Sequence, residues 1–207
     1  MDLIGIGFLI LVIVFSAIIH EVMHGVAAEW LGDKTARYAG RLTLNPIPHI
    51  DPFGSIILPL FFALSNSPFF FAWAKPVPYN PYNLKPGRFS EAIVAGAGPA
   101  SNLAIALLGG LLVRSGMFGG MSDVIFLVVL VNTMLFAFNL IPIPPLDGSK
   151  VLESLLPRPL AHSYADWRHR LEQNPFIGMG IVLLIVLLAG GAFGNFIYSL
   201  AQAIAGT

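Results

Sequence analysis

The pattern His20-Glu21-Val22-Met23-His24 places two imidazoles four residues apart, with a carboxylate between them. On a helix, the two histidines project from nearly the same face, so both can bind one metal ion. Zinc held in this way lowers the pKa of a bound water to ~7 and polarises a carbonyl, and Glu21 is placed to act as general base. The alternative is that these three side chains only cap the end of an apolar helix. We favour metal binding, because ionisable groups beside hydrocarbon are costly unless they are used.

A catalytic zinc ion usually has three protein ligands and an open position for water, so a further ligand is expected from another segment. The candidates by residue type are His49, Asp51, Asp123, Asp147, Glu153, His162 and His169. Asp147 stands out because it follows the proline-rich stretch 142–145, which forces the backbone out of a helix at the end of an apolar segment. Such irregular backbone is tolerated at membrane depth where it is buried or lines a wet cavity. On spacing alone, a turn or a helix cap at Asp147 is an equally good explanation.

Three other polar residues are candidate site residues, namely Asn102, Asn139 and His49, and each has two interpretations. The amides of Asn102 and Asn139 are candidates to bind substrate or the oxyanion of a tetrahedral intermediate, or to form hydrogen bonds between helices. Asn132 lies seven residues before Asn139, so this helical face is expected to be interior. His49 is a candidate group lining the site or a pH-sensitive gate, although an interfacial loop histidine is the reading we favour.

The composition indicates a membrane protein. Of the 207 residues, 56% are hydrophobic and only 11% are charged, whereas a soluble domain carries about a quarter charged residues. The formal net charge of zero gives no global field that would recruit nucleic acid. With no cysteine, disulfides and thiolate metal ligands are excluded. Because the first residues lack the basic region of a secretory signal, we interpret the first apolar run as a retained membrane helix.

We predict an all-α, polytopic helical bundle that forms a single integral-membrane domain over residues 1–207. The four full spans are expected at residues 3–31, 91–113, 124–141 and 176–200, the last with an interruption at 190–194. Prolines and polar residues break the apolar stretch 51–73 into halves too short to span, which predicts a re-entrant or split hairpin. We also expect a short strand at 41–44, an extended segment at 74–88 and an amphipathic segment at 148–174.

The basic residues help to fix the topology. If 51–73 returns to its entry side, every Lys and Arg except Arg114, which is 10 of the 11, lies in loops on one face. The positive-inside rule makes that face cytoplasmic. The ends of the helices that carry the motifs then meet at one membrane depth, near this face.

Three motifs together resemble the site-2 protease family of intramembrane zinc metalloproteases. They are HEVMH, AGPASN at 97–102 and NLIPIPPLDG at 139–148, and the resemblance extends over about residues 15–155. It implies one zinc ion per chain bound by His20, His24 and Asp147, with Glu21 as the catalytic base. We expect a compact form of the family, without a PDZ insert or a regulatory domain.

The resemblance implies hydrolysis of peptide bonds in or near transmembrane segments of other proteins. The expected partners are therefore a transmembrane protein substrate and membrane lipid, with no nucleic acid; the sequence carries no indication of oligomeric state. The alternatives are a membrane zinc transporter or metal-binding protein, and an inactive protein that binds membrane helices. The extended stretch AWAKPVPYNPYN is equally well read as a strand that pairs with an unwound substrate or as an interfacial loop.

Overall fold

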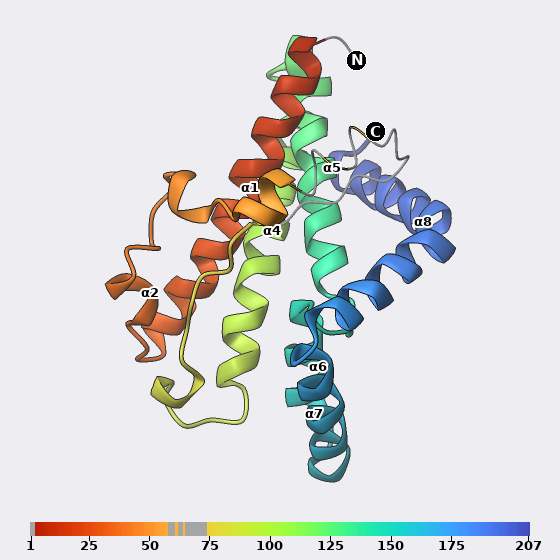
Figure 1. Ribbon diagram of the computed structural model, residues 1–207. Coiled ribbons are helices and arrows are strands. Elements are labelled where there is room, and N and C mark those ends of the chain that lie inside the picture. Colours follow the sequence, from red (N-terminus) through yellow and green to blue (C-terminus); the bar gives the residue numbers. More distant parts are fainter. Residues whose placement is uncertain (1–2, 58–60, 62–63, 65–73) are drawn as a thin grey trace.

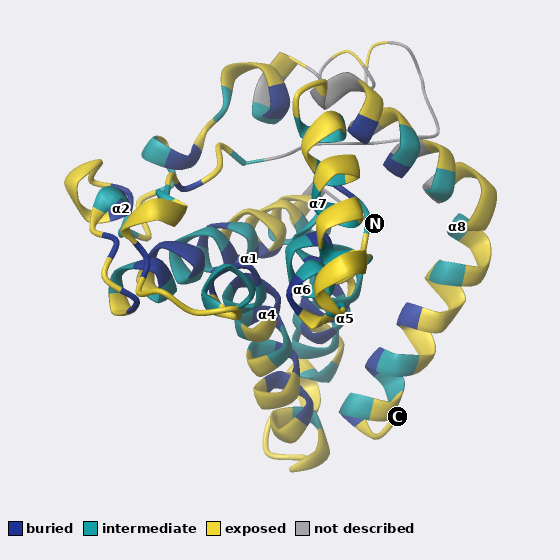
Figure 2. Ribbon diagram, turned by 90° about the horizontal axis from the view of Figure 1, so that it is seen from below, coloured by how far each residue is buried: buried dark blue, intermediate teal, exposed yellow. Residues whose placement is uncertain are grey.

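The computed structural model describes residues 3–57, 61, 64 and 74–207, and it is helical where it is regular. Within these described residues, four helices are long and apolar enough to span a membrane: Ile4–Trp30, Ser90–Arg114, Gly119–Asn139 and Leu187–Ala205. The predicted all-α polytopic bundle is therefore confirmed, and the chain is a multi-pass membrane protein. Figure 2 shows buried residues gathered where α1, α4, α5 and α6 meet, while the outer helix faces are exposed, as they must be to contact lipid.

The first span, α1 (Leu3–Trp30), is a single helix of 28 residues that carries HEVMH in its C-terminal half. It ends at Trp30, just before the expected stop at Gly32, whose φ of 109° suits a residue without a side chain. The amide of Asp33 returns to the carbonyl of Ala28 at 2.9 Å, which satisfies one of the free carbonyls at the helix end.

The second span, α4 (Ser90–Arg114), lies at the centre of the bundle and packs against α1, α5, α6 and α8. Small residues allow the close approach: a Cβ atom on Gly110 would lie 2.6 Å from the carbonyl oxygen of Ile204. Ala106 of this helix is fully buried against Val129 and Ala201. The central position of α4 brings the AGPASN motif against α1.

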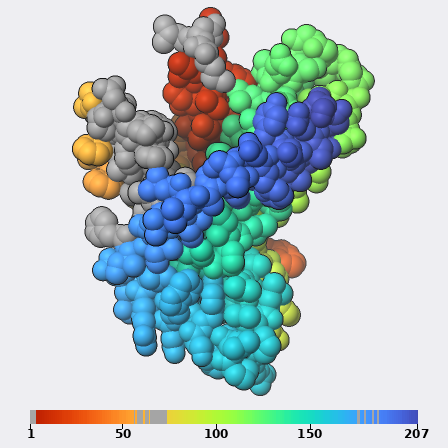
Figure 3. Space-filling view, turned by 90° about the vertical axis from the view of Figure 1, so that its right-hand side faces the viewer, coloured from red at the N-terminus to blue at the C-terminus, as the bar shows by residue number. Residues whose placement is uncertain are grey.

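The rest of the chain turns back along the bundle. The helix α5 (Ser122–Asn139) follows a short turn, η4 (Gly119–Met121), and the predicted amphipathic segment forms α6 (Asp147–Leu155) and α7 (Arg158–Glu172). The helix α8 (Pro175–Ala205) is continuous through the predicted interruption, although its path bends in Figure 1. It runs obliquely across the face of the molecule shown in Figure 3.

The connection between α1 and α4 contains α2 (Thr35–Tyr38), η1 (Ile47–His49), η2 (Pro52–Ile57) and η3 (Pro81–Asn83). The predicted strand at 41–44 is wrong, because this stretch bends and its ties to the neighbouring chain use side chains. Arg41 Nη2 donates to the carbonyl of Lys75 at 2.7 Å, and the ring of His49 binds the carbonyl of Thr43 at 3.0 Å. Most of the predicted hairpin at 51–73 lies outside the described residues, apart from η2, Phe61 and Leu64.

The segment from residue 74 to 80, hereafter the extended segment, has no regular helix, as its prolines predict. It runs beside α1 and α4 in Figure 1. Val77 is 5% exposed, and its side chain lies beside Gly25 of α1. The extended segment is therefore packed on the helix that carries HEVMH.

Candidate metal centre

His20, His24 and Asp147 converge in the structure. The two Nε2 atoms lie 3.0 Å apart, and Asp147 Oδ2 lies 3.1 Å from His20 Nε2 and 3.3 Å from His24 Nε2. One ligand atom from each residue lies within 4.8 Å of the other two. In the part of the chain that the structure describes, no other group of His, Cys, Asp and Glu side chains meets this condition. The helical spacing brings the two histidines together, and the fold adds the carboxylate from a residue 127 positions away from His20.

The histidine rings are oriented as metal ligands require. His24 Nδ1 lies 2.7 Å from the carbonyl oxygen of Val94, and His20 Nδ1 lies 2.7 Å from Asn102 Oδ1. Since an oxygen acceptor at Nδ1 needs a proton there, each Nε2 keeps its lone pair for the centre of the site. Histidine ligands commonly donate their second N–H to such a partner.

Gly98 supplies the space that a metal ion needs. A Cβ atom at this position would lie 2.5 Å from His24 Nε2 and 2.7 Å from His20 Nε2, so no side chain fits there. The vacant space faces the lone-pair side of both rings. With two imidazoles, one carboxylate and this space, the site fits a zinc ion with three protein ligands.

Asp147 is the first residue of α6, where an acidic side chain is favoured by the exposed N–H groups of the helix. The helix starts close to the end of α5: a Cβ atom on Gly148 would lie 2.2 Å from the carbonyl oxygen of Leu140. Burial acts to raise the pKa of Asp147, but the close approach of the His20 and His24 rings outweighs it and holds that pKa well below its usual range. The carboxyl group is therefore ionised at neutral pH, as a metal ligand must be.

Glu21 lies beside the three ligands and is not one of the group. Its Oε2 accepts a hydrogen bond of 2.8 Å from the backbone N–H of Val77. The structure thus puts the expected base between the metal site and the extended segment. This contact of Val77 was not predicted, since nothing in the sequence gives the register of 74–80 against α1.

Further hydrogen bonds hold the extended segment in place. Lys75 N donates to the carbonyl of His49 at 2.9 Å, and Asn80 N donates to Asp33 Oδ2 at 2.7 Å. Lys150 Nζ donates to the hydroxyl of Tyr79 at 2.9 Å, which links the extended segment to α6 one turn after Asp147. Of the Val77, Tyr79 and Asn80 amides that were expected to be available to a substrate strand, those of Val77 and Asn80 are therefore used within the protein.

Asn102, Asn139 and His49 occupy different environments. The amide nitrogen of Asn102 contacts Asn132 Oδ1 at 2.9 Å and the carbonyl of Ser16 at 3.4 Å, so this structure uses its donors inside the bundle. Asn139 donates to the carbonyl of Leu135 at 2.9 Å, one turn back, and its role toward an oxyanion stays a prediction. His49 is buried in η1 and does not join the ligand group.

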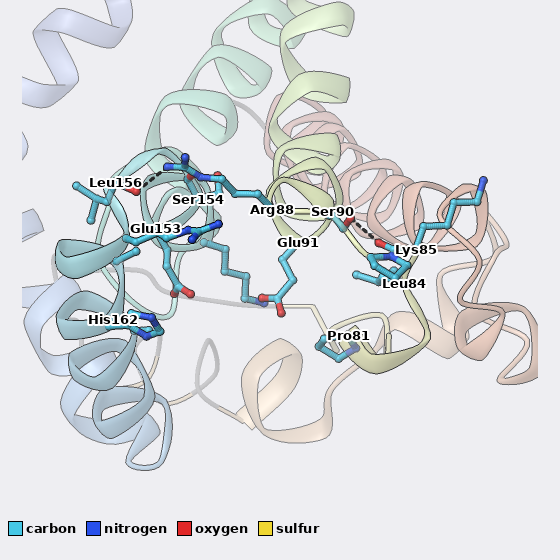
Figure 4. A pocket seen from close by; sticks show the side chains of 16 residues that line it. Pro81, Leu84, Lys85, Arg88, Ser90, Glu91, Glu153, Ser154, Leu156 and His162 are labelled. Carbon is cyan, nitrogen blue, oxygen red and sulfur yellow. Dashed lines mark hydrogen bonds between the residues drawn. The ribbon is translucent and has the colours of Figure 1, made fainter.

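The other ligand candidates also lie outside the group formed by His20, His24 and Asp147. Asp51 Oδ1 accepts from the amide of Gly54 at 2.6 Å, and Glu153 forms an ion pair with Arg168 at 2.7 Å. His162 lines a cavity of about 480 Å³ between the start of α4, α6 and α7, which Figure 4 shows. Arg88 also lines this cavity, and its guanidinium donates hydrogen bonds to the carbonyls of Ser154 and Leu156.

A multi-pass helical protein with two histidines and an aspartate around a space for zinc, and with a glutamate beside them, has the features of a membrane metalloprotease. Comparison with known proteins agrees. The family model described as "Peptidase family M50" matches residues 113–184, which include Asp147. No solved structure matches the chain.

Two curated relatives match a larger part of the chain. "Putative zinc metalloprotease YwhC" of Bacillus subtilis (strain 168) is 38% identical over 160 residues, which are 72% of this chain and 69% of the relative. "Putative zinc metalloprotease Rip2" of Mycolicibacterium smegmatis is 32% identical over 205 residues, which are 94% of this chain and 73% of the relative. The chain belongs to peptidase family M50, the site-2 protease family of zinc metalloproteases.

Proposed function

We propose that the protein is an intramembrane zinc endopeptidase that cleaves other membrane proteins in or near their transmembrane segments, as a step of regulated intramembrane proteolysis. The observation that carries this proposal is the position of the ligand group. His20 and His24 belong to a helix that is long and apolar enough to span a membrane. A peptide bond that reaches them must therefore do so at membrane depth.

The chemistry follows from the three ligands and the neighbouring carboxylate. Zinc bound by His20, His24 and Asp147 would supply a Lewis acid that lowers the pKa of water and polarises the scissile carbonyl. Glu21 takes a proton from the attacking water and returns it to the leaving amine. The N–H of Val77 orients the Glu21 carboxylate for these transfers, and Asn139 is our candidate donor to the oxyanion.

A substrate helix must unwind before its carbonyls become accessible, because its peptide groups are otherwise bonded within the helix. The extended segment lies against the base, and we propose that it forms one wall of the channel that receives the unwound chain. Because the amides of Val77 and Asn80 are used, pairing with substrate would rely mainly on the carbonyls of this segment.

The proteolytic proposal is tested with purified wild type and the Glu21→Gln variant, each shown to contain one zinc ion. Both are incubated in membranes with a panel of single-span substrates. The matched control is Glu29→Gln, which makes the same change two turns later in α1, at a residue whose partner is the exposed Arg37. We expect cleavage by wild type and by the control, and none by Glu21→Gln. Equal cleavage by wild type and Glu21→Gln, or none by either, would refute the proposal.

We further propose that the protein lies in the cell membrane with its metal centre near the cytoplasmic face. The charge asymmetry described above supports this orientation. Since the chain has no cysteine, single cysteines can report it cleanly. Tyr82 is 97% exposed in η3, which precedes the start of α4, and Met117 is 78% exposed after the end of α4 at Arg114. In intact cells, an impermeant maleimide should label Met117→Cys and not Tyr82→Cys. The opposite pattern would show that the metal centre lies near the outer face of the membrane.

A further inference from the structure

A chain of hydrogen bonds runs from His20 into the interior of the bundle. Asn102 of α4 contacts His20 Nδ1 through Oδ1 at 2.7 Å, and its nitrogen donates to Asn132 Oδ1 of α5 at 2.9 Å. Asn132 Nδ2 in turn donates to the carbonyl of Val128 at 2.9 Å and to the hydroxyl of Ser16 at 3.0 Å. Both asparagines are fully buried, so water cannot replace these partners.

The chain has only one consistent direction. The carbonyl of Val128 can only accept, so the nitrogen of Asn132 must face it and the oxygen of Asn132 must face Asn102. Asn102 must then present its nitrogen to Asn132 and its oxygen to His20. An oxygen at this point requires a proton on His20 Nδ1, which leaves the Nε2 lone pair facing the ligand group.

The two histidines differ in how this proton position is set. His24 Nδ1 faces the backbone carbonyl of Val94, which cannot donate, so its tautomer is fixed locally. The partner of His20 is a side-chain amide, which would present either an oxygen or a nitrogen if it were free to turn over. Something must therefore hold the Asn102 amide in one orientation. Of the two hydrogen bonds that its nitrogen donates, the shorter goes to Asn132 Oδ1.

We propose that Asn132 is a positioning residue that acts through Asn102 to keep the proton of His20 on Nδ1, and so keeps Nε2 available to zinc. This role rests on the metal centre of the proposed function. It makes Asn132 a residue that helps to set the affinity of that centre for zinc. Without Asn132, the Asn102 amide is held only by the long 3.4 Å bond to the carbonyl of Ser16, and it can turn over and donate to His20 Nδ1. The ring then carries its proton on Nε2, which opposes metal binding.

The test compares Asn132→Leu with a matched control, Thr133→Val. Thr133 is the next residue of α5 and is equally buried, and its hydroxyl has no hydrogen-bond partner among the described residues. Competition with a chelator measures the zinc dissociation constant of each protein in detergent. We expect Asn132→Leu to raise it ~10-fold to 100-fold, the range typical for partners of histidine ligands, and Thr133→Val to leave it unchanged. The variant Asn132→Asp, in its protonated form, keeps an acceptor toward Asn102 and a donor toward Val128, and should restore affinity.

A second measurement needs no folded variant. In metal-free wild type labelled with ¹⁵N-histidine, at a pH where the imidazoles are neutral, the Nδ1 of His20 should carry the proton and Nε2 should not. A proton on Nε2 in wild type would overturn the proposal, as would unchanged zinc affinity in Asn132→Leu or an equal loss in Thr133→Val. Neither readout involves peptide cleavage. A wild type that behaves as expected here but cleaves no substrate would refute the proposed function and leave this inference standing.

Discussion

At the scale of single residues, the space at Gly98 is as important to the metal centre as the ligands around it. A methyl group at this position would lie within 2.7 Å of both ring nitrogens that face the centre. Movement of either ring would strain the hydrogen bond of 2.7 Å that holds it at Nδ1. The methyl group would therefore occupy the place of the metal ion.

We predict that Gly98→Ala lowers the affinity for zinc by at least ~100-fold, at the upper end of the effects known for changes around metal ligands. The matched control is Gly96→Ala on the same helix, since a Cβ atom at Gly96 meets no atom within 4 Å. Both variants gain the same helix propensity. Zinc content after dialysis at a fixed free zinc concentration distinguishes them, and full zinc in Gly98→Ala would show that the space is not needed.

The sequence predicts only part of this site. The spacing of His20 and His24 is enough to predict that the two rings lie together, because a helix brings positions four apart to one face. Asp147 was left equal between ligand and cap by spacing, and only its resemblance to a family motif favoured a ligand. The role of Asn102 toward His20 depends on the orientation of its amide. That orientation is set by hydrogen bonds among α1, α4 and α5, and the sequence pattern does not predict how these helices pack.

At the scale of the elements, the extended segment connects Glu21, the proposed base, to the rest of the fold. Val77 contributes a backbone donor to Glu21 and a buried side chain against α1. These two contributions are separable by mutation. Proline removes the N–H and is compatible with extended backbone, whereas alanine keeps the N–H and removes most of the side chain.

We predict that Val77→Pro lowers kcat by ~10-fold to 100-fold, part of the contribution usual for general base catalysis, while zinc content is retained. Val77→Ala should keep most of kcat. Steady-state cleavage of one substrate by the three proteins provides the comparison. Equal losses in both variants would mean that the packing of the side chain, and not the donor, is what Glu21 needs.

Asp33 anchors the other end of the extended segment. Its buried carboxylate accepts hydrogen bonds from Thr35, Asn80 and Asn83. Burial acts to raise the pKa of Asp33, but these bonds outweigh it and lower that pKa below its usual value. A group with a lowered folded-state pKa stabilises the fold fully above the unfolded pKa of ~3.9, and this stabilisation is lost as the pH falls through the folded value.

We therefore predict that Asp33→Asn speeds hydrogen exchange in residues 77–84 by at least ~10-fold at neutral pH, since hydrogen bonds to a charged group are among the stronger ones. In wild type, protection of this segment should fall only as the pH drops below about 4. Asp166→Asn, at an exposed position of α7, is the control. Unchanged hydrogen exchange in Asp33→Asn would show that Asp33 does not anchor the extended segment.

The boundaries of the long helices were predictable because each is a long apolar run with a clear end. The predicted span 91–113 corresponds to Ser90–Arg114, and Gly32 follows α1 as expected. The strand expected at 41–44 failed for a physical reason: local propensity does not say whether a neighbouring backbone is available to pair with. Here the neighbouring chain at Lys75 is engaged by the side chain of Arg41 instead.

At the scale of the whole molecule, the metal centre joins two helices that are distant in sequence. His20 and His24 belong to α1, and Asp147 belongs to α6. A ligand that binds only the folded state stabilises it, by about 2.7 kcal/mol at a free concentration of about 100 Kd. Zinc bound by α1 and α6 should therefore stabilise the assembly of helices as well as serve catalysis.

We predict that removing zinc with a chelator lowers the thermal midpoint by about 5–10 °C, and that readdition restores it. The shift should vanish in Asp147→Ala and persist in Asp123→Ala, an exposed acid at the start of α5. Thermal unfolding in detergent, followed by circular dichroism, measures both. A zinc-dependent shift that survives in Asp147→Ala would indicate that this residue does not hold the metal.

The 127 residues that separate His20 from Asp147 also have a consequence for biosynthesis. While the ribosome has made only α1, α4 and α5, the nascent chain carries two of its three ligands, and Glu21 has no complete centre to serve. The centre closes when α6 has been synthesised and has docked beside α4. Under the proposed function, the polypeptide would thus be inert during insertion toward itself and toward neighbouring nascent chains in the same translocation channel.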